Sequence, residues 1–234
     1  MTNTGTTIYR GLGVLVLAAL LLAIMGTGAR GAIITPQWGI GSTDGAALET
    51  AFFSGYTDVT TETFAGFTAN TQGPLTLTVG ALTGGGYIGD DTTAQSGTGE
   101  YSVGSDVNYW SNGTPGQTGN KNGYTLSFAD PVTAFGFYAL DFHDVGGEVE
   151  LTFSTLGGDT TLNLYDLVGE QSNGSLIYFA FSSSDPISSV GFARAGGDGY
   201  AIDNISTATP IPGAVWLLGG GLVGLLGLRR RGVV

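Results

Sequence analysis

The chain has 234 residues, of which 7 are Lys or Arg and 19 are Asp or Glu, and it contains no cysteine. A chain of this length predicts one domain, and the lack of cysteine excludes disulfides, a thiol nucleophile and a cysteine-ligated zinc site. The acidic balance argues against nucleic acid and anionic lipid as partners, because both carry negative charge.

Residues 1–32 have the features of a targeting segment. Arg10 is the only charged residue before an apolar run, Leu12–Met25, and small residues follow that run. The order of basic, apolar and small residues predicts a secretory signal peptide, cleaved after Ala29 or Gly31. The alternative is an uncleaved N-terminal anchor, since a basic residue lies next to the cleavage site.

Residues 33–208 form the body of the protein. Lys121 and Arg194 are its only basic residues, and it holds all 19 acidic ones, so its formal charge is −17. Such a surface suits a secreted protein that stays soluble or binds divalent cations.

The body shows no convincing helix pattern. Short runs alternate apolar with polar residues, which is typical of half-buried strands. Two denser runs, Val132–Phe142 and Leu176–Phe181, indicate central strands buried on both faces. Paired Gly and Asn-Gly turn signals separate the runs. We therefore predict an all-β fold, an antiparallel β-sandwich, and its alternating runs contain Leu75, Leu77 and Val79, then Val149, Leu151 and Phe153, then Leu162 and Leu164.

The stretch Thr83–Asn122 is rich in glycine and poor in aliphatic residues. It predicts long surface loops with short strands near Tyr101–Val103 and Val107–Trp110.

Residues 209–234 form a second apolar segment. Prolines at 210 and 212 end the folded part, because proline interrupts helices and sheets. The run Ala214–Leu228 would span roughly 22 Å as a helix, and roughly 27 Å if it starts at Ile211, against a bilayer core of about 30 Å. The following Arg229, Arg230 and Arg231 favour the cytoplasmic side. We expect a transmembrane helix that holds the body outside the cytoplasm.

This tail resembles the C-terminal sorting signal of PEP-CTERM proteins, which are exported proteins of Gram-negative bacteria that typically make extracellular polysaccharide. The resemblance lies in Pro210-Ile211-Pro212-Gly213, the Gly-rich apolar helix and the Arg cluster. It matches the variant that lacks Glu between the prolines. The resemblance implies export machinery and an exosortase-type membrane enzyme as partners, with transient residence in the inner membrane before the protein reaches the cell surface or medium. The alternative is a plain, permanent single-span anchor.

The second half of the body also resembles the jelly-roll domain common in PEP-CTERM proteins, which is similar to carbohydrate-binding modules. The likeness covers about 75 residues and ends in Tyr200-Ala201-Ile202-Asp203-Asn204. In such domains a Glu near the first strand faces the final strand, and together they hold a structural calcium ion.

The resemblance implies one structural calcium here. Calcium takes six to eight oxygen ligands, and the candidates are Glu62, Asp198, Asp203 and Asn204. The alternative is that these residues form turns and accept backbone N–H groups.

Catalysis is the weaker hypothesis for the body. The lone histidine, His143, would have to serve any Ser-His-Asp triad, and no Gly-x-Ser-x-Gly motif is present. No two carboxylates stand out as a glycosidase pair. A structural or glycan-binding role in the cell envelope or extracellular matrix is favoured over a secreted carbohydrate-active enzyme.

Glycan binding would use aromatic residues in the glycine-rich loops, namely Tyr87, Tyr101, Tyr109 and Trp110. Exposed rings on loops of a rigid sandwich could stack on sugars of an extracellular polysaccharide. The alternative is that they cover an edge of the sandwich. Exposure of Tyr109 and Trp110 distinguishes the two.

Overall fold

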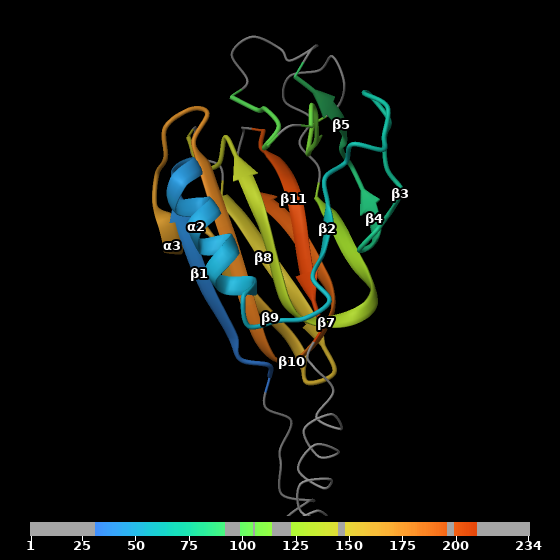
Figure 1. Ribbon diagram of the computed structural model, residues 1–234, viewed down its shortest axis with the longest axis vertical. Helices are drawn as coiled ribbons and strands as arrows, with labels where there is room; N and C mark the ends of the chain where they lie inside the picture. Colours follow the sequence, from blue (N-terminus) through green and yellow to red (C-terminus); the bar gives the residue numbers. More distant parts are fainter. Residues whose placement is uncertain are drawn as a thin grey trace, which may run out of the picture. The chain divides into compact units, whose positions relative to one another are not determined.

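The computed structural model describes residues 31–91, 99–104, 106–113, 123–144, 148–195 and 199–209, within the compact unit Ala32–Val234 apart from Gly31. The described strands all pair in antiparallel fashion (Figure 1). They are β1 (Ile34–Ile40), β2 (Thr60–Glu62), β3 (Leu75–Leu77), β4 (Gly80–Gly84), β5 (Tyr87–Asp90), β6 (Asn108–Ser111), β7 (Tyr124–Leu140), β8 (Glu148–Thr155), β9 (Gly158–Asn163), β10 (Leu176–Ala195) and β11 (Ala201–Ala208). The antiparallel β-sandwich is confirmed. The apolar run of the predicted signal peptide and the predicted C-terminal transmembrane helix lie outside the described residues.

The strands β7 and β10 run through both layers of the sandwich. In the first layer, Ala134–Leu140 of β7 pairs with β11 and with the start of β10, and β1 pairs with the other edge of β10. In the second layer, the start of β7 pairs with β4 and with the end of β10, which in turn pairs with β8. The register of β10 against β7 shifts between Ser182 and Ser189. Such an irregularity bends a strand, and here it lets one hydrogen-bonded sheet fold over itself.

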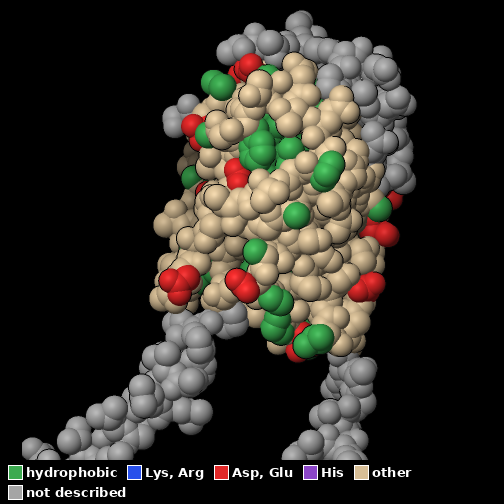
Figure 2. All heavy atoms as spheres, turned by 90° about the vertical axis from the view of Figure 1, so that its right-hand side faces the viewer, with side chains coloured by type: hydrophobic (Ala, Val, Ile, Leu, Met, Phe, Trp, Pro, Cys, Tyr) green, Lys and Arg blue, Asp and Glu red, His purple; other side chains and the backbone are tan. Residues whose placement is uncertain are grey.

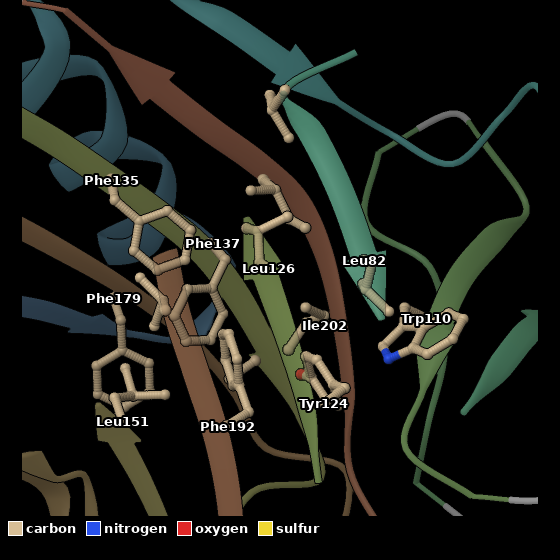
Figure 3. Close-up of a cluster of buried hydrophobic side chains, with 14 of the residues drawn as sticks. Leu82, Trp110, Tyr124, Leu126, Phe135, Phe137, Leu151, Phe179, Phe192 and Ile202 are labelled. Atoms are coloured by element: carbon tan, nitrogen blue, oxygen red, sulfur yellow. The ribbon is translucent and has the colours of Figure 1, made fainter. Parts of the chain in front are cut away.

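Aromatic side chains from the two layers meet between them. The ring of Phe137 in the first layer lies 5.4 Å from that of Phe192 in the second, and Phe181 lies 5.0 Å from Phe153. Figure 3 shows Phe137 and Phe192 converging with Leu126 and other core residues. Burying each such side chain contributes about 1.5–3 kcal/mol relative to leaving it exposed.

The central strands of the first layer are buried on their outer face as well. Tyr138 and Tyr178 point away from the interlayer core and pack with Phe53 of helix α2 (Gly41–Phe53). Figure 1 shows α2 lying over β1 and β10. The prediction that Val132–Phe142 and Leu176–Phe181 are buried on both faces is therefore confirmed.

The prediction of no helix in the body was wrong. Helix α2 spans 13 residues and has no side-chain N-cap, and a short helix, α3 (Tyr165–Val168), follows β9. The sequence pattern does not reveal α2, because a glycine and not a large apolar residue lies against the sheet at position 45. A Cβ atom at Gly45 would lie 3.1 Å from Tyr138 Cε1 and 3.2 Å from Tyr178 Cβ. Tertiary packing, which a hydrophobic pattern does not reveal, holds this helix.

The glycine-rich stretch contains different strands from those predicted. The strand expected near Val107–Trp110 exists as β6, shifted by one residue, and β5 was not predicted. Tyr101–Val103 forms no strand, so that prediction was wrong. Glu62 also does not lie near the first strand, because β1 precedes it. It lies on β2, whose register places it opposite Ile205 of β11.

Two leucines of the β8–β9 hairpin test the core directly. Leu151 is fully buried, whereas Leu156 in the turn is 99% exposed. We expect Leu151→Ala to lower the free energy of unfolding by about 2–5 kcal/mol and Leu156→Ala to change it by less than about 0.5 kcal/mol. Urea unfolding of a fragment comprising residues 32–209, followed by tryptophan fluorescence, measures both. Equal losses would contradict the assignment of the core.

Candidate functional site

Tyr109 and Trp110, which the loop hypothesis placed on the surface, are buried. Trp110 is 0% exposed and its ring meets that of Tyr124 edge-on at 5.9 Å, while Tyr109 is 3% exposed. Two glycines make room for these rings, one in the adjacent strand β5 and one directly before it. A Cβ atom at Gly86 would lie 2.3 Å from the Trp110 ring, and one at Gly89 would lie 2.1 Å from that of Tyr109. Neither ring offers a face for stacking on a sugar, and the alternative role in covering the sandwich fits both.

Tyr87 and Tyr101 are half-buried. The hydroxyl of Tyr101 donates a hydrogen bond of 3.2 Å to the carbonyl oxygen of Gly174. Burial raises the pKa of both hydroxyls, and nearby carboxylates, Glu100 for Tyr87 and Asp141 for Tyr101, raise it further. The four aromatic residues therefore do not share one exposed platform.

Glu62 joins β2 to the segment before β4. Its Oε1 accepts a hydrogen bond from the backbone N–H of Phe64 at 2.8 Å. Its Oε2 accepts one from the N–H of Thr78 at 2.8 Å and one from the Thr78 hydroxyl at 2.7 Å. The side chain is only 7% exposed. These contacts satisfy a buried carboxylate whose desolvation would otherwise be costly.

Asp203 holds the loop that precedes β6. Its Oδ2 accepts the N–H of Val103 at 2.7 Å, and its Oδ1 accepts the N–H of Asn204 at 2.7 Å. Asn204 has a φ of 47°, where the pairing of β11 with β7 changes register. Burial raises the pKa of Asp203 to about 7, with Asp106 and Asp91 adding to the rise and the two N–H donors opposing it.

The calcium site stays a prediction. Glu62 lies on β2, beside the β11 strand of Asp203, and not on the first strand as the resemblance implies. Every carboxylate oxygen of the two already accepts a hydrogen bond. Within the described ranges, no three His, Asp or Glu side chains come together in a way that could hold a metal ion. Asp198 lies outside those ranges. The observed contacts match the alternative of turn and backbone-binding roles.

His143 is also a core residue. It is 4% exposed, and its ring meets those of Phe142 and Tyr165 edge-on at 4.9 and 5.5 Å. This packing does not present the imidazole to solvent, where a triad histidine would meet a substrate.

The sorting motif Pro210–Gly213, the arginines Arg229–Arg231 and residues 1–30 of the signal segment lie outside the described residues. None of the helices in the described ranges has the length and apolarity needed to cross a lipid bilayer.

A shallow hollow of about 450 Å³ lies on the outer face of the second layer. Leu126 and Leu151, which are next in sequence to Thr125 and Thr152, point into the core. Since side chains alternate along a strand, Thr125 and Thr152 point outward. A volume of this size falls within the range of small-molecule sites. The hollow is lined mainly by small neutral residues, Thr83 and Gly84 from β4, Thr125 from β7, Thr152 from β8, and Gly191 and Ala193 from β10.

Sequence reasoning missed this hollow. Thr125 and Thr152 occupy the polar positions of alternating strands, which the pattern assigns to solvent without saying which strands are neighbours. Only the register places Thr125 beside Gly191, and Gly191 beside Thr152. The loop aromatics were the stronger sequence signal for a glycan site, but most of their surface is buried in the folded protein.

No protein-family model and no curated protein matches the chain. Solved structures show distant likenesses. The K2 cleaved adhesin domain of Lys-gingipain has 14% identity and a TM-score of 0.45, over 65% of this chain and 98% of that chain. A family 11 carbohydrate-binding module of a Clostridium thermocellum cellulase has 13% identity and a TM-score of 0.30, over 65% and 96% of the two chains. A xylanase fragment from the same organism, with CBM22-1 and GH10 modules and bound xylohexaose, has 8% identity and a TM-score of 0.31, over 64% and 28%. No ligand for this chain follows from these likenesses.

The burial of Asp203 predicts an unusual pH dependence. Its pKa is about 7 in the folded protein and near 3.8 in an unfolded chain. The folded state therefore binds more protons between these values, so the free energy of unfolding falls as pH rises from about 4 to about 7. Asp203→Asn removes the titrating group and so flattens the slope, although its single acceptor oxygen keeps only one of the two backbone hydrogen bonds.

Chemical unfolding of residues 32–209 at pH 4.5, 6 and 8, in the presence of a chelator, measures the slope. Asp58→Asn is the control, because Asp58 is exposed and its φ of 60° suits asparagine. If Asp203→Asn left the pH dependence of the free energy of unfolding unchanged, Asp203 would not be its cause.

Proposed function

We propose that this chain is an exported, non-catalytic protein of the cell envelope or extracellular matrix, with a jelly-roll-like domain that binds glycan. One observation carries the proposal: a highly acidic β-sandwich is bracketed by two apolar segments, each next to arginine. Arg10 precedes the first, and Arg229–Arg231 follow the second. This charge asymmetry favours both outer ends on the cytoplasmic side and the sandwich on the other side.

The surface of the sandwich supports a role outside the cytoplasm. Figure 2 views the side on which Figure 1 places β3, β4 and β5, and acidic side chains there are scattered among neutral ones. The body has only two basic residues, so it offers no basic patch for nucleic acid or anionic lipid.

A binding role is supported by the contrast between the hollow and the ionisable groups. His143 is packed among rings, and both Glu62 and Asp203 are engaged by backbone N–H groups. The hollow on the second layer, in contrast, is open to solvent, and its lining is uncharged and includes three threonines and three glycines. This arrangement suits recognition of a polyhydroxylated ligand without chemistry on it.

Export is tested by a reporter enzyme that is active only outside the cytoplasm. The reporter is fused after Thr209, because β11 ends at Ala208. We expect activity that is lost when residues 1–32 are deleted. Activity that persists without residues 1–32 would contradict the signal peptide.

The sorting tail is tested by the mass of the mature protein. In cells with an active exosortase-type enzyme, we expect the mature chain to end near Pro212 and to lack Arg229–Arg231. Replacing Pro210 and Pro212 by alanine, which removes the motif but keeps the apolar run, should leave the tail attached. A full-length mature protein with the native motif in those cells would instead support the permanent anchor.

A further inference from the structure

A row of threonines crosses the outer face of the second layer. The strand register places Thr83 beside Thr125, Thr125 beside Gly191, Gly191 beside Thr152, and Thr152 beside Thr161. We call these five positions the hydroxyl row. Since neighbouring strands lie about 4.8 Å apart, the row presents hydroxyls at regular spacing across β4, β7, β8 and β9, with one gap on β10.

The next row on the same face is also small and neutral for most of its length. Ser127, Ser189 and Ser154 are neighbours in the register, and Ala81 and Asp159 lie at the two ends. On the described strands of this face, acidic residues lie toward the rim, at Asp159, at Glu150 opposite Ala193 and at Glu148 beyond it. In a body of formal charge −17, a neutral central area of this kind is distinctive.

Gly191 lies at the gap in the hydroxyl row, and the fold does not require a glycine there. Its φ lies outside the left-handed range, and a Cβ atom would find its nearest neighbour, Thr152 Cβ, at 3.8 Å, an ordinary contact distance. Gly136 on β7 is different, because a Cβ there would lie 2.4 Å from Tyr178 Oη. Glycine inside a strand weakens it and often marks close approach of a ligand. The missing side chain at Gly191 keeps the hollow open.

We propose that the hydroxyl row is the binding site for an extended neutral polysaccharide, which crosses the strands with a sugar seated over Gly191. The proposal rests on the glycan-binding function above and names its site and substrate class. The charge of the body repels acidic polymers, and it also repels a second copy of the chain. The central rows of this face hold no acidic side chain that could pair with a cationic partner, apart from Asp159 at one end. A neutral polyhydroxyl chain is not repelled by the acidic body and needs no charged partner on this face.

The chemistry of the row suits such a ligand. A threonine hydroxyl has one donor and two acceptor lone pairs, as does a sugar hydroxyl. The Thr83 hydroxyl donates to the carbonyl oxygen of Thr125 at 3.5 Å, and the hydroxyls of Thr152 and Thr161 are hydrogen-bonded to each other at 3.4 Å. Each of these three keeps acceptor capacity toward the outer face. One hydrogen bond gained against water contributes only about 0.5–1.5 kcal/mol. Recognition therefore requires several contacts along an extended chain, which a row across five strands supplies.

The full-length protein in detergent micelles tests the proposal by affinity electrophoresis. The probes are dextran, mixed-linkage β-glucan and galactomannan as neutral polymers, and alginate as an acidic one. We expect retardation by at least one neutral polymer and none by alginate. Gly191→Val, which fills the hollow, should weaken that binding about tenfold or more. Thr125→Val, which removes one hydroxyl at nearly constant shape, should weaken it roughly two- to tenfold.

Two controls separate binding from folding. Thr35→Val changes an exposed threonine of β1 in the other layer and should bind as the native chain does. Gly191→Ala should bind more weakly yet unfold at an equal or higher temperature, because alanine is less costly than glycine in a strand. A glycine required by the fold would show the reverse.

The outcomes distinguish the site from the function. If a neutral polymer binds and both Gly191→Val and Thr125→Val bind it equally well, the function stands and the site is wrong. If the native protein binds alginate alone, the substrate class is wrong. Binding of none of the four polymers would overturn the site and count against the glycan-binding function, and a dimer that Gly191→Val dissociates would assign the face to a second copy.

Discussion

The sharing of β7 and β10 by both layers is the constraint on which the rest of this structure depends. Each strand is long enough to contribute to one layer, shift register and continue into the other. In the first layer their alternate side chains must be buried on both faces. Phe137 and Phe179 fill the space between the layers, and Tyr138 and Tyr178 require a cover on the outside. Helix α2 supplies much of that cover, which explains a helix that its own sequence pattern does not predict.

This cover is fixed by polar contacts as well as by packing. Glu49 of α2 accepts hydrogen bonds from the hydroxyls of Tyr138 at 2.9 Å and Ser206 at 3.3 Å, and Ser206 lies 2.8 Å from Thr61 Oγ1. The helix is thereby joined to β7, β11 and the nearby β2. The outer face of the second layer has a different composition, with small hydroxyl residues around Gly191. The fold thus uses one outer face for stability and leaves the hollow of the other accessible.

The sequence predicted those parts of the fold that follow from alternation within a single strand. The inward positions Val149, Leu151 and Phe153 and the doubly buried central runs could be read directly. Helix α2 could not, because Gly45 makes the contact that an apolar side chain would normally make. The loop aromatics suggested an exposed glycan site for a related reason. The sequence pattern does not show that Gly86 and Gly89 leave the space in which Trp110 and Tyr109 are buried. The hydroxyl row depends on the register of five strands, and no local pattern specifies which strands are neighbours.

The central claim is that a neutral glycan binds over Gly191 and not on the aromatic loops. Amide resonances of the isotope-labelled protein, followed during titration with a neutral oligosaccharide from the polymer it binds, test this most directly. The account predicts concentration-dependent shifts centred on Thr125, Gly191 and Thr152, with little change at Tyr87 and Tyr101. Shifts centred on Tyr87 and Tyr101, with Gly191 unchanged, would contradict it.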